Sequence, residues 1–253
     1  MSNWTSTVFD SGRIVSRWEF LALLLLAMMA RPIQAADALI ENVSPPAAIA
    51  LARYTANQGQ TARWPVETIR IDASLPKLAK NGRFRAVRQL PPLGRPQYQV
   101  LETAGDSTVK QQVIVRYLSA EAKTSEIPAS SVAITPANYR FRYLGAVQLG
   151  DNPVYAFRIT PRKKREGLIK GVLWLDGETG IAVRQSGYLV KSPSIFIKRV
   201  SVTRENYVHD GMVEARITHL AVDTRLVGRA ELVIEERPAA EIESGSSPLT
   251  AAQ

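Results

Sequence analysis

The chain contains no cysteine among its 253 residues. No disulfide can therefore hold its fold, although an exported protein would be free to form one. No cysteine is present to carry a lipid anchor either, so the mature protein is not itself a lipoprotein. Its stability must come from burying apolar residues, which make up 45% of the sequence and are enough for a folded core.

Histidine is also scarce, and this weakens the case for catalysis. The two histidines, His209 and His219, are ten positions apart, and neither has a metal-ligand partner at short spacing. A catalytic triad with His219 would need a serine and a carboxylate that the sequence does not place. The acidic residues Asp176, Glu178 and Asp210 fall in predicted turns, where Asp is favoured for backbone reasons. We therefore predict no enzyme activity, no metal and no cofactor.

No apolar run in the chain is long enough to cross a membrane. The run over residues 20–30 has 11 residues, whereas a transmembrane helix needs about 20. Two arginines precede it, a charged residue and a proline end it, and small residues suited to cleavage follow: Arg13, Arg17, Arg31-Pro32 and Ala35-Ala36. This pattern is typical of a secretory signal peptide. We predict a cleaved signal peptide over residues 1–35 and a periplasmic location, the alternative being an uncleaved membrane anchor.

Acidic residues are in deficit, with 23 against 32 lysines and arginines, for a net charge of +9. Removing residues 1–35 takes away three arginines and two acidic residues and leaves a net charge of +8. A basic surface favours anionic partners such as lipid head groups or acidic proteins. Nucleic acid is not an expected partner, because the chain is predicted to be exported and carries no nucleic-acid-binding motif.

Periodicity predicts two helices and about ten strands. A helix is expected over residues 45–57, after the cap-like Ser44-Pro45-Pro46. A second is expected over residues 107–122, behind the N-cap candidates Asp106 and Ser107. Three strands precede this second helix, the first two joined by a hairpin turn at Asn81-Gly82, and seven more follow between residues 138 and 236. Short turns imply antiparallel neighbours, and an open sheet of this size tends to curl around covering helices.

Four stretches of the chain resemble a known family. They are residues 134–141, 155–164, 171–184 and 191–199, and the most telling is Trp174-Leu175-Asp176 followed by Thr179-Gly180. That segment is a strand–turn–strand signature and not a catalytic one. The stretches resemble the outer-membrane lipoprotein-sorting proteins, the LolA-like group. The resemblance covers most of the mature chain and is clearest over residues 134–236.

The resemblance implies a fold class and a function. The fold is α+β and mainly β: an unclosed antiparallel β-barrel, or half-barrel, of about ten strands with helices covering the concave face. We expect one such domain over residues 36–237 and a disordered tail over residues 238–253. The function implied is that of a monomeric periplasmic carrier that holds the acyl chains of lipoproteins or other outer-membrane lipids between sheet and helices. The alternative is a non-lipid sensor or scaffold module that binds a protein partner through its rim.

Two sets of residues are candidates for binding. Period-two alternation places one apolar set on a common face, where it is predicted to line an acyl-chain groove, although alternation does not distinguish an open groove from an ordinary packed core. This set is Tyr139, Phe141, Tyr143, Tyr155, Phe157, Leu173 and Leu175. The second set is a basic loop predicted to dock on an anionic membrane surface or an acidic partner protein, the alternative being a solvated turn. It consists of Arg162, Lys163, Lys164 and Arg165.

Overall fold

The computed structural model of the protein describes residues 43–57, 64–91, 94–149, 152–225 and 228–239. The predicted signal peptide over residues 1–35 lies outside these ranges, as does the predicted tail from residue 240 onward. Among the described residues, no helix combines the length and the apolar character that a membrane span requires.

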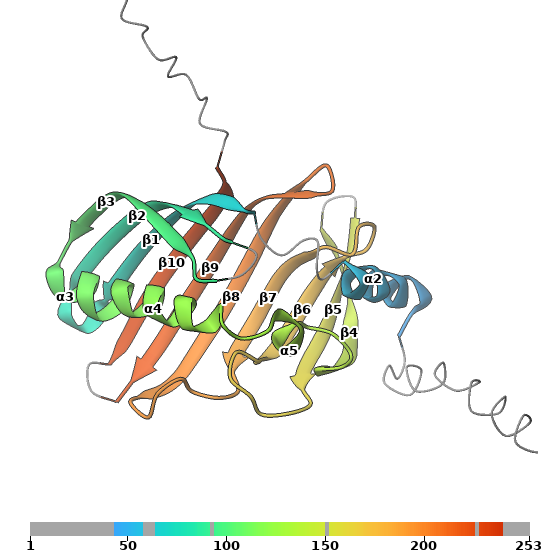
Figure 1. The fold of residues 1–253 in the computed structure, drawn as a ribbon. Helices are drawn as coiled ribbons and strands as arrows, with labels where there is room; N and C mark the ends of the chain where they lie inside the picture. The colour runs from blue at the N-terminus through green and yellow to red at the C-terminus, as the bar shows by residue number, and fades with distance from the viewer. Residues whose placement is uncertain (1–42, 58–63, 92–93, 150–151, 226–227, 240–253) are drawn as a thin grey trace, which may run out of the picture. The chain divides into compact units, whose positions relative to one another are not determined.

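Ten strands form one antiparallel sheet (Figure 1). They are β1 (Val66–Leu75), β2 (Lys80–Gln89), β3 (Gln97–Gly105), β4 (Tyr139–Leu149), β5 (Asn152–Pro161), β6 (Ile169–Asp176), β7 (Ala182–Leu189), β8 (Ile197–His209), β9 (Met212–Thr224) and β10 (Arg229–Pro238). Their order is β3-β2-β1-β10-β9-β8-β7-β6-β5-β4. Because the edge strands β3 and β4 are not neighbours in this order, the sheet is unclosed. The predicted fold class is confirmed.

The two predicted helices are present, and the short helical segments α5 (Ala129–Val132) and η2 (Pro76–Leu78), a 3-10 turn, were not predicted. The predicted helices comprise α2 (Pro45–Ala56), α3 (Ser107–Val109), the π-helical segment η3 (Lys110–Ile114) and α4 (Val115–Thr124). The segment from α3 to α4 is the predicted second helix. Asp106 caps it, since its Oδ1 accepts from the backbone N–H of Thr108 at 2.7 Å and of Val109 at 3.3 Å.

The predicted hairpin turn at Asn81-Gly82 is wrong. Both residues lie inside β2, where Gly82 is paired with Ala73 of β1. The chain reverses earlier, through η2 and Ala79, which adopts the left-handed conformation at φ 51°. Gly82 instead permits close packing, because a Cβ there would lie only 3.0 Å from Cγ1 of Val109, which would have to shift. The predicted turn at Asp210-Gly211 does join β8 to β9, with positive φ at both residues as a tight hairpin prefers.

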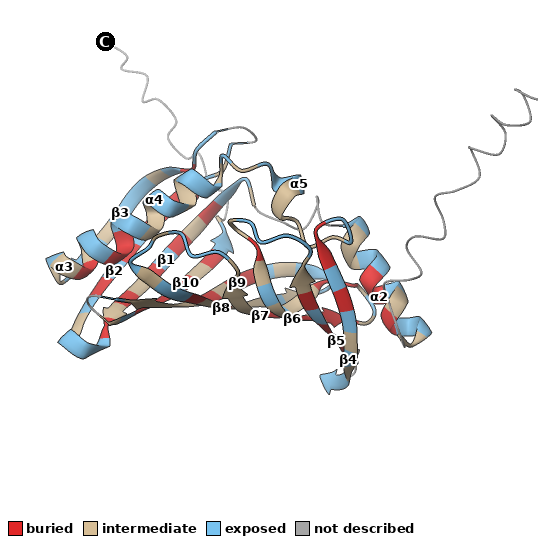
Figure 2. Cartoon of the chain, turned by 90° about the horizontal axis from the view of Figure 1, so that it is seen from below, coloured by how far each residue is buried: buried red, intermediate tan, exposed pale blue. Residues whose placement is uncertain are grey.

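Both helical segments pack on the same side of the sheet, which we call the inner face. Segments α3 and η3 contact β1 and β2, and α2 contacts β6. Residues directly opposite each other in an antiparallel ladder point to the same side of the sheet. A continuous series of such pairs leads from Ile71, beneath η3, to Leu173, beneath α2, so the two residues lie on the same face. Figure 2 shows the resulting alternation of buried and exposed positions along the strands. The remaining side is the outer face.

Candidate ligand-binding face of the sheet

One row of directly opposed residues crosses nine strands of the inner face. From β4 to β2 it reads Tyr143, Phe157, Leu173, Gln185, Arg204, Thr218, Ile234, Ile71 and Phe84. Three apolar residues lie at each end. The three in the middle, which we call the central polar row, are Gln185, Arg204 and Thr218. This otherwise apolar row is therefore interrupted at its centre by a cation and two hydrogen-bonding side chains.

The next row along the strands is apolar or carries no side chain. It contains Phe141, Ile159, Gly171, Gly187, Val202, Leu220, Leu232, Ala73 and Gly82. The two central glycines face each other, and a Cβ on Gly171 would lie 1.9 Å from the backbone oxygen of Ser186. The backbones of β6 and β7 thus approach too closely for any side chain. Nothing projects from the inner face at these two positions, which lie beside Val202.

The buried apolar residues on this face form two separate clusters. In the first, Val109, Val113 and Ile114 of the helical segment pack on β1, β2 and β10. In the second, Ala47, Ala50 and Leu51 of α2 pack on β4, β5 and β6. The middle strands β7 to β9 contribute no buried residue to either cluster. The apolar surface is continuous across the sheet, but its close-packed cover is divided in two.

Helix α4 runs across the sheet between these clusters (Figure 1). None of its residues is buried. Tyr117 and Leu118 on α4, and Leu220 and Val222 on β9, are partly buried and pack against the margin of the first cluster. Protein interiors are normally packed as tightly as organic crystals. At these four positions the apolar surface of the helix and of the sheet therefore remains partly open to solvent.

The seven predicted groove residues all lie together in the second cluster. Phe157, Leu173 and Leu175 are 0% exposed, and Tyr139, Phe141 and Tyr155 are at most 8% exposed. Tyr143 is partly buried, with its ring centroid 5.6 Å from that of Phe157. The hydroxyl of Tyr139 accepts a hydrogen bond from the backbone N–H of Ile169 at 3.1 Å. These residues share one face as predicted, and α2 covers them.

A buried polar network lies on the other side of the central polar row, and the sequence did not reveal it. Arg88 of β2 is 1% exposed and forms ion pairs with Glu67, Glu121 and Glu236. Its Nε lies 2.6 Å from Oε1 of Glu67. Glu121 comes from α4 and also accepts from the hydroxyl of Tyr98 at 2.7 Å. The network thus fastens α4 to the sheet.

The network continues across the middle strands. Arg216 of β9 lies 3.6 Å from Glu236, between Nη1 and Oε2. Its Nε donates to Oδ1 of Asn206 at 3.0 Å, and Asn206 donates to the backbone oxygen of Ala182 at 2.6 Å. A chain of polar contacts therefore runs from β7 to β2, one row away from Arg204.

Burial and pairing shift the pKa values of this network in different directions. Burial raises the pKa of Glu67 above its usual range, and the nearby Arg88 only partly offsets this. The Oε2 of Glu67 is buried and has no hydrogen-bond partner among the described residues. Burial also acts to raise the pKa of Glu236, but Arg88, Arg216 and Arg204 outweigh it and lower that pKa. Glu236 is therefore held as a carboxylate, whereas Glu67 tends to keep its proton.

A signal for this network was present in the sequence. Arg88 alternates in phase with Phe84 and Ala86, as Glu236 does with Leu232 and Ile234. A charge in phase with the apolar face of a strand must either be paired or be a boundary of the core. Period-two alternation puts each charge on the apolar side of its strand, but it does not supply the partners.

The predicted docking loop is exposed at all four positions. Two of its side chains are engaged: Nε of Arg162 donates to the backbone oxygen of Pro136 at 2.7 Å, and Nη2 of Arg165 donates to Oδ1 of Asn138 at 2.9 Å. Lys163 and Lys164 make no hydrogen bond or ion pair with the described residues. The loop therefore presents two free ammonium groups between two fixed guanidinium groups.

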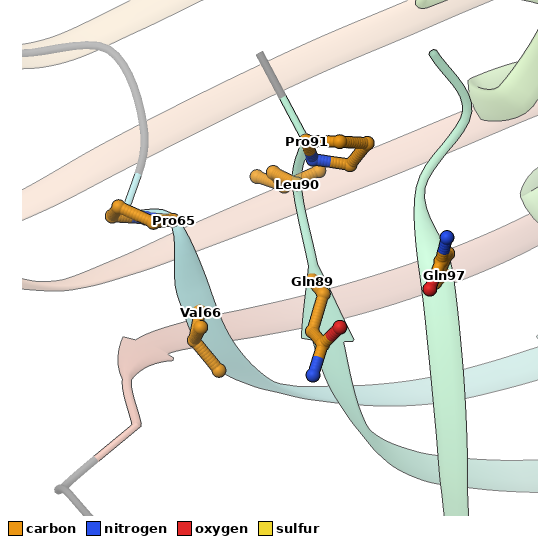
Figure 3. A pocket seen from close by; sticks show the side chains of 6 residues that line it. All are labelled: Pro65, Val66, Gln89, Leu90, Pro91 and Gln97. Carbon is orange, nitrogen blue, oxygen red and sulfur yellow. The ribbon is translucent and has the colours of Figure 1, made fainter. Parts of the chain in front are cut away.

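Two surface hollows lie away from the central polar row. One, of about 340 Å³, lies at the ends of β1, β2 and β3 and is lined by Pro65, Val66, Gln89, Leu90, Pro91 and Gln97 (Figure 3). The other, of about 900 Å³, includes Arg184 and Glu205, which alternate with Gln185 and Arg204 and so belong to the outer face. Neither contains a predicted groove residue. In the described part of the chain, no group of three or more His, Cys, Asp or Glu residues is arranged to hold a metal ion.

No family model matches the chain, and no curated protein matches it significantly in sequence. Among solved structures, a LolA superfamily protein from Nitrosomonas europaea is 12% identical, with a TM-score of 0.37 over 77% of this chain and 94% of that one. A DUF1329 family protein from Desulfovibrio piger is 13% identical, with a TM-score of 0.39 over 81% and 96% of the two chains. A domain from Vibrio parahaemolyticus assigned to outer-membrane lipoprotein sorting is 12% identical, with a TM-score of 0.35 over 80% and 95%. The group that the sequence resembles is thus found again among the structural matches, at a similarity that does not say what this chain binds.

Proposed function

We propose that the protein binds acyl chains, those of lipoproteins or of another outer-membrane lipid, on the inner face beneath α4. The observation that carries this proposal is the set of half-buried apolar side chains on α4 and β9, Tyr117, Leu118, Leu220 and Val222. An acyl chain placed between helix and strand would complete their burial. Between these residues and the second cluster, Gly171 and Gly187 place no side chain on the inner face, so an acyl chain could extend across them.

The strength required of such a site can be estimated. Each buried CH₂ contributes about 0.8 kcal/mol to membrane anchoring, so a 16-carbon chain is held by roughly 13 kcal/mol. A carrier must offer a nearly equivalent apolar surface, yet not a better one, because the chain must also leave. A face that is apolar but not tightly covered meets both requirements.

The seven predicted groove residues have a place in this proposal. They would receive the far end of a long acyl chain once α2 is displaced from them. Helix α2 is held at its C-terminal end, where Arg53 donates to the backbone oxygen of Glu178 and where Gly180 lies against the helix backbone. Movement of α2 therefore requires the loss of these contacts at the turn between β6 and β7 and of the packing of Ala47, Ala50 and Leu51 in the second cluster.

We also propose that the protein works in the periplasm and that residues 162–165 bring it to an anionic membrane surface. The charge pattern of the N-terminal segment supports export. The two free lysines of the loop support docking, because each cation near such a surface contributes about 1 kcal/mol. An encounter of this strength is weak and reversible, as a shuttle needs.

Native mass spectrometry of the protein purified from its source tests the binding proposal. We expect a lipid to co-purify with the parent. Leu220→Asp places a carboxylate beneath α4 and should abolish the co-purification of lipid. Val233→Asp places the same charge on the outer face of the neighbouring strand β10 and should leave the bound lipid unchanged. A ligand-free parent would favour the sensor or scaffold alternative, and equal lipid retention by the two variants would contradict a site beneath α4.

A further inference from the structure

Arg204 is the one member of the central polar row that carries a charge, and it acts on the carboxylate of Glu236 only from beyond ion-pair distance. Three arginines and three glutamates belong to the inner face: Arg88, Arg204, Arg216, Glu67, Glu121 and Glu236. Arg88 pairs with all three carboxylates, and Arg216 shares Glu236. Within the described ranges no carboxylate oxygen lies within ion-pair distance of Arg204. The acidic charge of this face is concentrated at one end, and the centre is left positive.

The hydrogen-bonding capacity of Arg204 is also largely unused. Its Nε donates to Oγ1 of Thr218 at 3.4 Å. The two terminal nitrogens donate to no described residue, and the side chain is only half-buried. A guanidinium presents these nitrogens as a planar fork that suits the paired oxygens of a carboxylate or a phosphate.

Gln185, directly opposite Arg204 on β7, adds a second unused polar group. It is 8% exposed, and its side-chain amide forms no hydrogen bond with the residues that the structure describes. An amide and a guanidinium that both lack partners and face each other across neighbouring strands form a donor set for one anionic group.

The surface on one side of Arg204 is apolar. Two residues further along the strands lies the series Val202, Leu220 and Leu232, and beyond it the series Val200, Val222 and Ala230. On the opposite side lies the saturated network of Asn206, Arg216 and Glu236. A ligand whose anionic end meets Arg204 can therefore extend its hydrocarbon in only one direction, over the half-buried residues beneath α4.

From these observations we infer that the ligand of the inner face is an anionic amphiphile, whose phosphate or carboxylate group binds Arg204 and Gln185. The inference rests on the proposed function and narrows it to a class of lipid. A neutral amphiphile would cover the two polar side chains without giving the guanidinium of Arg204 a counter-charge, which is unfavourable. An anion without a chain would leave the apolar rows uncovered.

Isothermal titration of the protein with three 12-carbon probes tests this. Dodecyl phosphate and dodecanoate carry an anionic group, and dodecanol has the same chain without it. We expect both anions to bind at least about tenfold more tightly than dodecanol, since hydrogen bonds to charged groups are the strong ones. Comparing the two anions assigns the head group as phosphate or carboxylate. Inorganic phosphate alone should not displace the two anionic probes. Displacement by phosphate would contradict an amphiphile as the ligand and would indicate a site for a free anion.

Variants separate the role of Arg204 from that of net charge. Arg204→Gln should weaken the two anions about tenfold or more and leave dodecanol unchanged, and Arg204→Lys should recover part of the loss. Arg158→Gln removes an equal charge from the outer face and should bind as the parent does. Urea unfolding of each variant confirms that it is folded. Equal affinity of the parent for dodecanol and the anions, or equal losses in Arg204→Gln and Arg158→Gln, would overturn the inference. Failure of all three probes to bind would instead count against the proposed function.

Discussion

Arg88 of β2 and Glu121 of α4 form an ion pair in which Arg88 is 1% exposed. Through this contact a helix that buries none of its own residues is still fixed to the sheet. The hydroxyl of Tyr98 holds the other oxygen of Glu121. The position of α4 is therefore set by these polar contacts together with the apolar packing of the preceding segment η3, through Val113 and Ile114.

Removing Arg88 should strongly destabilise the fold. Arg88→Ala removes the cation shared by Glu67, Glu121 and Glu236, and among the described residues only Glu236 keeps a second cation, Arg216. Breaking a buried pair in this way costs about 3–5 kcal/mol. Urea unfolding measures the loss. Arg95→Ala breaks an exposed pair with Glu126, in which both side chains are more than half exposed, and should cost less than about 1 kcal/mol. Similar losses for the two variants would show that the Arg88 network contributes little.

The pH dependence of stability should reveal the proton on Glu67. Burial raises its pKa above the ordinary value of 4.5. Just above pH 4.5 the folded protein therefore holds a proton that the unfolded chain has lost, so the free energy of unfolding falls as pH rises through that window. Glu67→Gln has no such proton, and its stability relative to the parent should increase as pH rises from 4 to 8. A difference that stays constant over this range would contradict the raised pKa.

Gly180→Ala should loosen α2. Gly180 has φ 74°, and a Cβ there would lie 2.6 Å from Cβ of Arg53 and 2.9 Å from the backbone oxygen of Ala50. Backbone strain of this kind costs about 1–3 kcal/mol, and here it also pushes against the helix. We expect lower thermal stability and faster amide exchange in residues 45–56. Gly94→Ala, also at positive φ but with only Pro91 Cγ nearby at 3.8 Å, is the matched control for backbone strain without the helix contact.

Two lysines should carry the membrane attraction of the basic loop. Lys163→Ser with Lys164→Ser removes two free cations while keeping the hydrogen bonds of Arg162 and Arg165. Stability should change within about 0.5 kcal/mol, and sedimentation with anionic vesicles at low salt should fall. Lys77→Ser with Lys123→Ser removes the same charge from other exposed positions. Equal binding by the parent and both double variants would leave the loop without a role in docking.

The mature protein should begin near Ala36. The apolar run of 11 residues and the small residues after it suit cleavage by signal peptidase. N-terminal sequencing of the protein from a periplasmic extract measures this directly. An intact Met1 in a membrane fraction would support the anchor alternative instead.

Much of the fold follows from local pattern. Alternation predicted ten strands, because each strand buries only one side, and the 107–122 repeat predicted the helix that Asp106 caps. Asn81-Gly82 misled because its glycine permits close packing against Val109, a residue distant in sequence. Local pattern does not report such contacts.

The site was less accessible to sequence reasoning for a related reason. The central polar row and its apolar neighbours depend on the register of the four ladders from β6 to β10. A shift of one residue in any of them would turn a whole strand to the other face. Bulges such as the one between Trp174 and Leu175 change that register in ways that alternation does not show. Arg88 could be placed in phase with Phe84, but its partners are 21, 33 and 148 positions away.

The central claim, that an acyl chain lies beneath α4, can be measured at a single position. The chain has no cysteine, so Leu220→Cys and Val233→Cys each provide one site for an environment-sensitive fluorophore, on the inner and the outer face respectively. On titration with hexadecanoate we predict a blue shift of the emission at position 220 and no change at position 233. An unchanged emission at position 220, or an equal shift at both positions, would contradict binding on the inner face.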